Sequence, residues 1–189
     1  ERELPAAIEK LFSGERVNAT ENRPALHTAL RGDEHVKVDG HEIYPEIQRN
    51  RERMRVFSEA VRAGQWKGAT GLAFTHVLAL GIGGSALGPR LAIEALHADH
   101  DGPQVRFVSN IDAAEFDDAI EGLDPATTLA VVASKTFTTQ ETMTNAAAAR
   151  ASSVMRGQSP FPTASFDTST ACPRPSASFW RTAMRSTIR

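Results

Sequence analysis

The sequence predicts an α/β fold in which helices flank a parallel sheet, with an N-terminal helical segment before it. Residues before His76 carry apolar side chains mainly at helical spacing. From His76 onward, short apolar runs at 76–81, 105–109 and 128–133 alternate with stretches of helical spacing. Strands that alternate with helices form parallel sheets with helical crossovers, so these two observations predict the fold class.

Before the first strand we expect three helices, over residues 3–13, 20–32 and about 41–63, with a polar loop at 33–40. Thr20 is a suitable N-cap for the second helix. The apolar positions of the three helices are Leu4, Ile8, Leu11 and Phe12; Ala25, Leu26, Ala29 and Leu30; and Ile43, Ile47, Met54, Phe57 and Val61.

The third helix carries four arginines at 49, 51, 53 and 55, which leave two interpretations open. They could contact RNA, or they could belong to a solvated, salt-bridged face. We favour the second interpretation because Glu46, Glu52 and Glu59 share the same stretch.

The later half is read as β-α-β-α-β-α. The strand at 76–81 precedes a helix to about Ala98, the strand at 105–109 precedes a helix with Phe116, Ala119 and Ile120, and the strand at 128–133 precedes a helix from Gln140 to Arg150. In a flavodoxin-like strand order of 2-1-3, the first and third strands are neighbours. The loops that follow them then border one crevice, the place where such sheets bind ligands.

The loop after the first strand is rich in glycine, at positions 81, 83 and 84, and is followed by Ser85. Glycines allow sharp turns and close approach of a ligand, and the start of the next helix supplies N–H donors and a positive dipole end. The sequence therefore predicts an anion site here, most simply for a phosphate group.

The loop after the third strand offers hydroxyl groups, one ammonium group and a second helix N-terminus. A phosphate dianion needs several donors and a positive charge. The alternative is that the loop caps its own helix and that its lysine is only solvated. The residues of this loop are Ser134, Lys135, Thr136, Phe137, Thr138 and Thr139.

Two other types of site receive less support. Residues 81–86 also match the dinucleotide pattern G-x-G-x-x-A, but no acidic residue is cleanly placed at the end of the second strand. A dinucleotide-binding oxidoreductase is therefore the weaker alternative. His97, Asp99, His100 and Asp101 could ligate a metal, although a polar helix C-terminus explains them equally well, and we expect no metal site.

Charge and composition exclude further classes of function. The formal net charge of the 189 residues is -2, which gives no basic face for nucleic acid. No apolar run approaches a membrane span, no signal peptide is visible, and the single cysteine, Cys172, fits a reducing compartment. Residues 152–189 are rich in serine, threonine, proline and arginine, and their composition predicts a disordered tail.

Three motifs resemble the glucose-6-phosphate isomerase family: residues 81–89 (GIGGSALGP), 107–112 (FVSNID) and 134–142 (SKTFTTQET). Residues 20–31 resemble that family's N-terminal helical segment, with Asn22 as a mild departure where the family has glycine. The similarity covers about residues 10–150, and the third motif is the most specific.

The resemblance implies two sugar isomerase (SIS) domains and a cytoplasmic homodimer that interconverts glucose 6-phosphate and fructose 6-phosphate in glycolysis and gluconeogenesis, without metal or organic cofactor. It implies that Gly84 and Ser85 touch the substrate, and that the loop at 134–139 holds the phosphate through Ser134, Lys135, Thr136 and Thr139. The catalytic glutamate, histidine and lysine of the family come from its later half, so the catalytic residues are unknown here.

We therefore interpret the chain as an N-terminal fragment of such an isomerase: an N-terminal helical segment at 1–70, the first part of a SIS-type α/β domain at 71–151, and a tail at 152–189 that resembles a shifted reading frame. A sugar-phosphate-binding SIS module without catalysis is the alternative function.

Overall fold

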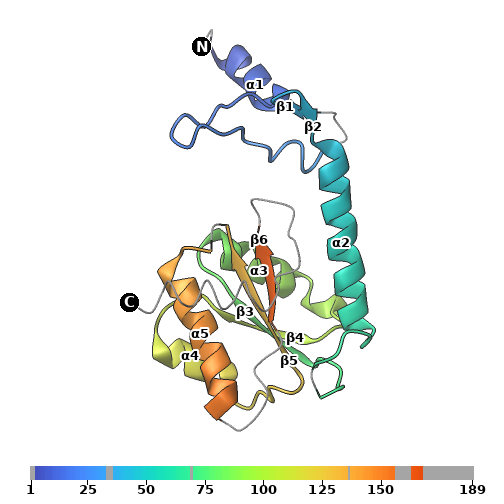
Figure 1. The fold of residues 1–189 in the computed structure, drawn as a ribbon, viewed down its shortest axis with the longest axis vertical. Coiled ribbons are helices and arrows are strands. Elements are labelled where there is room, and N and C mark those ends of the chain that lie inside the picture. Colours follow the sequence, from blue (N-terminus) through green and yellow to red (C-terminus); the bar gives the residue numbers. More distant parts are fainter. Residues whose placement is uncertain (1–2, 33–35, 69, 136, 156–162, 168–189) are drawn as a thin grey trace. The chain divides into compact units, whose positions relative to one another are not determined.

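The computed structural model describes residues 3–32, 36–68, 70–135, 137–155 and 163–167 (Figure 1). The chain divides into two compact units, Glu1–Phe57 and Ser58–Arg189, which we describe one by one. The division falls inside a helix, whereas the sequence placed the boundary near residue 70, and the boundary at 70 stays a prediction. Within the described residues, we find no helix with the length and apolarity that crossing a bilayer requires.

The first unit begins with α1, Leu4–Ser13, which confirms the first predicted helix. Gly14 ends α1 in the left-handed conformation, with φ at 85°. A Cβ atom at Gly14 would lie 2.7 Å from Cγ1 of Val36 and 2.8 Å from the carbonyl oxygen of Lys37. Glycine is therefore required here both for the backbone conformation and for the close packing of the neighbouring segment.

The second predicted helix, over residues 20–32, is wrong: this stretch forms turns. Asn18 and Arg23 exchange two backbone hydrogen bonds of 3.0 and 3.1 Å, and the side-chain oxygen of Asn18 accepts from the amide of Glu21 at 3.2 Å. Such side-chain bonds compete with a helix for the backbone donors. Pro24 also disfavours helical backbone at the residue before it.

A short hairpin at residues 37–42 replaces the end of the predicted polar loop at 33–40 and the first residues of the predicted third helix. Strands β1 (Lys37–Val38) and β2 (His41–Glu42) pair antiparallel, and the two residues between them, Asp39 and Gly40, have φ values of 50° and 81°. Asp-Gly is a preferred sequence for two-residue hairpin turns with positive φ. After the hairpin, α2 covers Tyr44–Arg62, close to the predicted 41–63.

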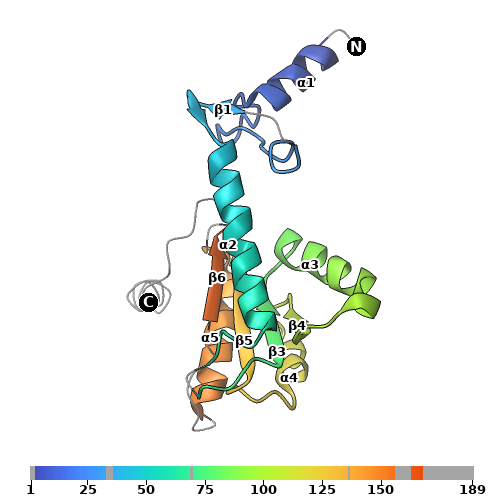
Figure 2. The same cartoon turned by 90° about the vertical axis from the view of Figure 1, so that its right-hand side faces the viewer.

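The second unit contains a four-stranded parallel sheet in the order β4-β3-β5-β6 (Figure 2). The first three strands are β3 (His76–Leu80), β4 (Gln104–Val108) and β5 (Thr128–Ser134), within one residue of the predictions. The order of these three confirms the predicted 2-1-3 arrangement. The loops after β3 and β5 therefore leave the same edge of the sheet from neighbouring strands.

The helices of this unit cover both faces of the sheet. They are α3 (Gly84–Ala95), followed by a 3₁₀ turn at His97–Asp99, then α4 (Ala113–Ile120) and α5 (Gln140–Met155). One core cluster joins α4 and α5 to one face of the sheet, through Leu78, Leu80, Val108, Phe116, Ile120, Leu123, Ala130, Val132, Ala146 and Ala149.

Helix α3 packs on the opposite face. The guanidinium carbon of Arg90 on α3 lies 5.2 Å from the ring centre of Phe107, whose side chain alternates with that of the core residue Val108. Two leucines of α3, Leu87 and Leu91, are 64% and 69% exposed, so one apolar stripe of this helix faces away from the sheet.

The region predicted as a tail holds two regular elements. Helix α5 runs to Met155, and β6 (Thr163–Asp167) pairs parallel with β5, so that Thr163 lies opposite Ala130 and Asp167 opposite Ser134. The composition predicted disorder over residues 152–189, whereas five of these residues form a strand. The physical reason is that the open edge of β5 offers backbone donors and acceptors whatever the side-chain pattern. The rest of the predicted tail, 156–162 and 168–189, lies outside the described residues.

Candidate functional site

The glycine loop leads directly from β3 into α3. Gly83 has φ at 57°, a conformation that favours glycine, and its carbonyl oxygen accepts from the amides of Ala86 at 3.0 Å and Leu87 at 2.8 Å. Helix α3 then begins at Gly84, and Ser85 lies half-buried in its first turn. A Cβ atom at Gly84 would meet nothing within 4 Å, so the space beside this residue is open.

The second loop begins at Ser134, the last residue of β5, which is only 3% exposed. Its hydroxyl oxygen accepts from the amide of Phe137 at 3.0 Å. Phe137 has φ at 53° and packs against the core beneath the sheet's edge. One buried hydroxyl thus fixes the start of this loop, as the capping interpretation of the sequence expects.

The remainder of the second loop leads into α5. Lys135 and Thr138 are exposed, and Thr139 is half-buried, with its carbonyl oxygen accepting from the amide of Met143 at 3.1 Å. Thr139 therefore stands at the start of the helix. Thr136, which the sequence also places in the site, lies outside the described residues.

Gly81 brings the two loops together. A Cβ atom built on it would lie 3.0 Å from the carbonyl oxygen of Ser85 and 3.2 Å from that of Ala133, the residue before Ser134. The end of β3, the first turn of α3 and the end of β5 are therefore in close contact at this glycine. The sequence indicated Gly81 only as a turn residue, because nothing local shows that β5 lies against it.

The acidic residues near this edge have structural partners. Asp112 caps α4 by accepting from the amide of Ala114 at 2.9 Å. Glu115, which the sequence analysis did not single out, accepts from both the amide and the hydroxyl of Ser109, at 3.2 and 3.1 Å. Glu141 lies in the first turn of α5, where a carboxylate stabilises the helix dipole.

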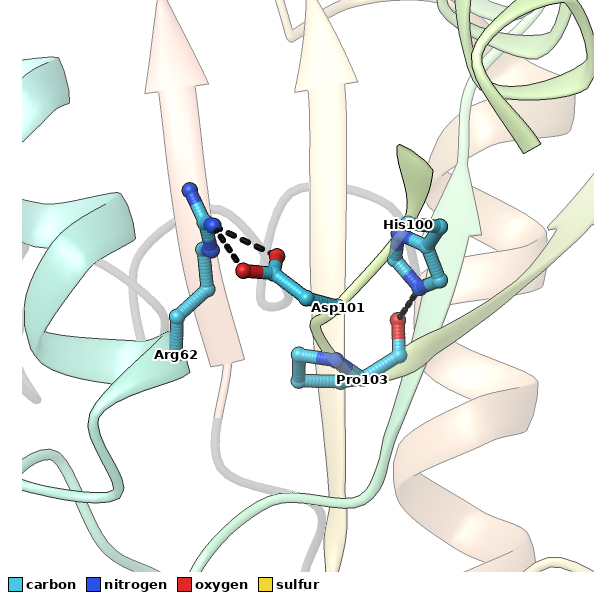
Figure 3. A network of polar contacts seen from close by, with 4 residues as sticks. All are labelled: Arg62, His100, Asp101 and Pro103. Atoms are coloured by element: carbon cyan, nitrogen blue, oxygen red, sulfur yellow. Dashed lines mark hydrogen bonds and ion pairs between the residues drawn. The ribbon is translucent and has the colours of Figure 1, made fainter. Parts of the chain in front are cut away.

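Two of the four suggested metal ligands, His100 and Asp101, bind other groups of the protein (Figure 3). Arg62 donates two hydrogen bonds from one nitrogen to the carboxylate of Asp101, at 2.5 and 2.7 Å, and Nε2 of His100 lies 2.9 Å from the carbonyl oxygen of Pro103. Hydrogen bonding and charge from Arg62 lower the pKa of Asp101. Among the described residues, no three His, Cys, Asp or Glu side chains cluster closely enough to hold a metal ion.

The arginines of α2 follow the salt-bridge interpretation at one position. Nε and one terminal nitrogen of Arg55 donate to the two oxygens of Glu52, at 2.8 and 2.6 Å. This fork also lowers the pKa of Glu52, with the hydrogen bond as the largest cause.

The edge where β3 and β5 end thus combines two helix N-termini, a serine in a first helical turn and one lysine. Lys135 is the basic side chain of these two loops, and the glycine loop leaves open space beside Gly84. Helix N-termini with nearby hydroxyl and ammonium groups suit an anion, and they suit a phosphate better than a cation or an apolar ligand.

The chain is similar to known proteins over most of its length. The family model "Phosphoglucose isomerase" matches residues 1–166. A glucose-6-phosphate isomerase from Methylococcus capsulatus is 52% identical over 152 residues, which are 78% of this chain and 28% of that protein. One from Chelativorans sp. is 52% identical over 144 residues, 75% of this chain and 26% of that protein.

A solved structure is also similar. The crystal structure of a glucose-6-phosphate isomerase from Chlamydia trachomatis has a TM-score of 0.72 and 29% sequence identity, and the match covers 89% of this chain and 33% of that one. The chain spans about a quarter of the length of the curated relatives it matches. Because the family model covers most of the chain, the chain belongs to the phosphoglucose isomerase family.

Proposed function

We propose that this chain binds the phosphate group of a sugar phosphate at the edge where β3 and β5 end, as the N-terminal part of a glucose-6-phosphate isomerase. The observation that carries the proposal is the contact at Gly81, which places the first turn of α3 against the end of β5. Two loops suited to anions are thereby held beside each other, in a chain of the phosphoglucose isomerase family.

Each loop has a separate role in this proposal. Gly84 leaves room for the ligand and Ser85 donates from its hydroxyl. Lys135 supplies the positive charge, and Thr139 and the hydroxyl hydrogen of Ser134 act as donors, together with Thr136. Phe137 and Thr138 complete the substrate-binding loop, whose shape is kept by the hydrogen bond from the amide of Phe137 to Ser134.

The reaction proposed for the whole protein is the interconversion of glucose 6-phosphate and fructose 6-phosphate. After the sugar ring opens, a base removes the proton from C2 and a proton is delivered to C1 through an enediol, so no oxidant or reductant is consumed. The catalytic residues remain unassigned. A homodimer in the cytoplasm, without a cofactor, is part of the same proposal.

The test is a calorimetric titration with glucose 6-phosphate, inorganic phosphate and glucose. Replacing Lys135 with alanine removes a charge-assisted hydrogen bond, which contributes about 1.5–3 kcal/mol, so the phosphorylated sugar should bind roughly ten- to a hundredfold more weakly. Glucose should bind both proteins equally poorly, because the lost contact is to the phosphate.

Lys67→Ala is the matched control. Lys67 is exposed in the loop before β3, where the hydroxyl of Thr70 donates to the carbonyl oxygen of Ala126 just before β5. It therefore lies at the amino-terminal edge of the sheet, and its removal should leave binding unchanged. Equal affinities of wild type and Lys135→Ala would refute the phosphate assignment and leave the second loop as a helix cap.

The second candidate is a sugar-phosphate-binding module that does not catalyse. This candidate is supported by the extent of the match, because the chain aligns with only about a quarter of each relative. Similarity over that part alone does not assign the relatives' activity to this chain. An assay of this chain for fructose 6-phosphate formation separates the two. Binding without turnover would favour the module, and turnover would exclude it.

A further inference from the structure

One buried side chain links a helix and a loop that follow two strands that are not neighbours in the sheet. Asn145 lies on α5, is only 4% exposed, and donates from Nδ2 to the carbonyl oxygen of Asn110 at 2.7 Å. Asn110 belongs to the loop after β4, whereas α5 follows β5. Since the strand order is β4-β3-β5, this bond joins the loop after β4 to the helix after β5, and β3 with its glycine loop lies between these two strands.

The loop after β4 is held at three successive points. Glu115 binds the amide and hydroxyl of Ser109, Asn145 binds the carbonyl of Asn110, and Asp112 begins α4 as its cap. The first and third of these contacts are local, between residues of one loop and its own helix. The bond from Asn145 is the contact among these that fixes the loop relative to α5, whose start forms part of the proposed phosphate site.

We infer that Asn145 is a positioning residue for the sugar-phosphate site: its amide sets the place of the β4 loop, residues 109–112, against the start of α5. The inference rests on the proposed function. Asn145 lies more than one turn beyond the start of α5, so it acts through the loop and not on the ligand itself.

The choice of an amide has a chemical reason. A carbonyl oxygen only accepts, so its partner must donate, and a leucine of similar size would leave the Asn110 carbonyl without this bond. An ionised carboxylate would repel it. A protonated carboxylic acid, in contrast, has one O–H donor and can take the place of the amide.

This difference gives a pH-dependent test with Asn145→Asp. Burial raises the pKa of a carboxyl group, so the introduced group should be ionised at pH 8 and largely protonated near pH 5. The native carboxylates on this loop, α4 and α5 are Asp112, Glu115, Asp117, Asp118 and Glu141, and they are present in every variant. The quantity to compare is therefore the ratio of glucose 6-phosphate dissociation constants, variant to wild type, at each pH.

We expect Asn145→Asp to bind glucose 6-phosphate roughly two- to tenfold more weakly than wild type at pH 8. This range of dissociation constants corresponds to the loss of one neutral hydrogen bond. The ratio should return toward one near pH 5. Asn145→Leu should show the loss at both pH values. Thr144→Asp is the control for an added charge, because Thr144 is exposed at the adjacent position of α5. Its ratio of dissociation constants, variant to wild type, should stay near one at both pH values.

Amide hydrogen exchange of the ligand-free chain separates positioning from general destabilisation. In Asn145→Asp at pH 8, exchange should accelerate at residues 110–112 while the amides of β3 and β5 keep their protection. Equal acceleration in the strands, or a binding ratio that does not respond to pH, would overturn the inference. Wild-type binding with unchanged affinity in all variants would overturn it too, while leaving the proposed function intact. A wild-type chain that does not bind glucose 6-phosphate would refute the proposed function, and with it any role of Asn145 there.

Discussion

Replacing Gly81 with alanine tests the contact that brings the two loops together. The added Cβ atom would lie 3.0 Å from the carbonyl oxygen of Ser85, 3.1 Å from Cβ of Ser85 and 3.2 Å from the carbonyl oxygen of Ala133. Two of these atoms are backbone. Ala133 belongs to β5, which is paired on both sides, so its carbonyl cannot move without disturbing the sheet.

Overpacking of this kind typically costs about 1–3 kcal/mol. Gly88→Ala provides the control, since Gly88 lies inside α3 and an added Cβ atom would meet nothing within 4 Å. Alanine there should stabilise the chain by about 0.5–1 kcal/mol, because glycine is the poorer helix former. The two variants should thus differ by roughly 1.5–4 kcal/mol in the free energy of unfolding.

The assay is urea unfolding followed by circular dichroism. For a small protein the free energy of unfolding falls by about 1–3 kcal/mol per molar urea, so the midpoints should differ by on the order of 1 M. Glucose 6-phosphate binding should also weaken in Gly81→Ala, because the alanine pushes Ser85 away from β5. A midpoint for Gly81→Ala equal to that of wild type would refute the close contact.

Two further predictions concern single side chains. The carboxyl group of Asp101 should titrate below its usual range in an NMR pH series, and its pKa should return to that range in Arg62→Ala. Any stabilisation from this ion pair is present above the ordinary carboxyl pKa and is lost as the pH falls through the lowered pKa of Asp101. An Asp101 titration that does not respond to the loss of Arg62 would contradict the ion pair. Ser134→Ala should cost about 0.5–1.5 kcal/mol of unfolding free energy and accelerate exchange of the Phe137 amide, because the hydroxyl is that amide's acceptor. Unchanged exchange at Phe137 would contradict it.

The strands were predictable because burial made their sequences strongly patterned. In β3 and β5, apolar runs end at a glycine and at a serine, and the structure has them within one residue of the prediction. The flavodoxin-like order was an expectation for a sheet of this class, and it agreed with the finding that the two loops richest in anion-binding groups follow the first and third strands. That order is now observed.

The N-terminal unit was harder because local hydrogen bonds decide it. Helical spacing of four apolar residues between Thr20 and Gly32 predicted a helix. Instead, Asn18 accepts hydrogen bonds from the backbone amides of Glu21 and Arg23, and Pro24 disfavours helical backbone at the residue before it. The hairpin at Asp39-Gly40 carried a visible turn signal. Its strands are only two residues long, too short for alternation to show in the sequence.

Within the site, the sequence could give residue types and loops but not distant contacts. The hydrogen bond from Asn145 to Asn110 joins residues 35 positions apart, and the approach of Gly81 to Ala133 spans a still larger separation in the sequence. No periodicity or spacing rule reports such pairs. These contacts become predictable only when the strand order is known, because that order brings the ends of β3, β4 and β5 to one edge of the sheet.

The capping and phosphate-binding interpretations of the second loop are compatible once Ser134 is placed. Its hydroxyl oxygen accepts from the amide of Phe137, and a hydroxyl can donate its own hydrogen at the same time. The acceptor role holds Phe137 at positive φ, which turns the chain toward α5. The donor role then remains for an anion at the start of that helix. A serine buried at the end of a strand can therefore shape the loop in the free protein and still offer its hydrogen to a ligand. Alanine would lose both roles. A capping residue that points to solvent would lose the role as donor to the ligand.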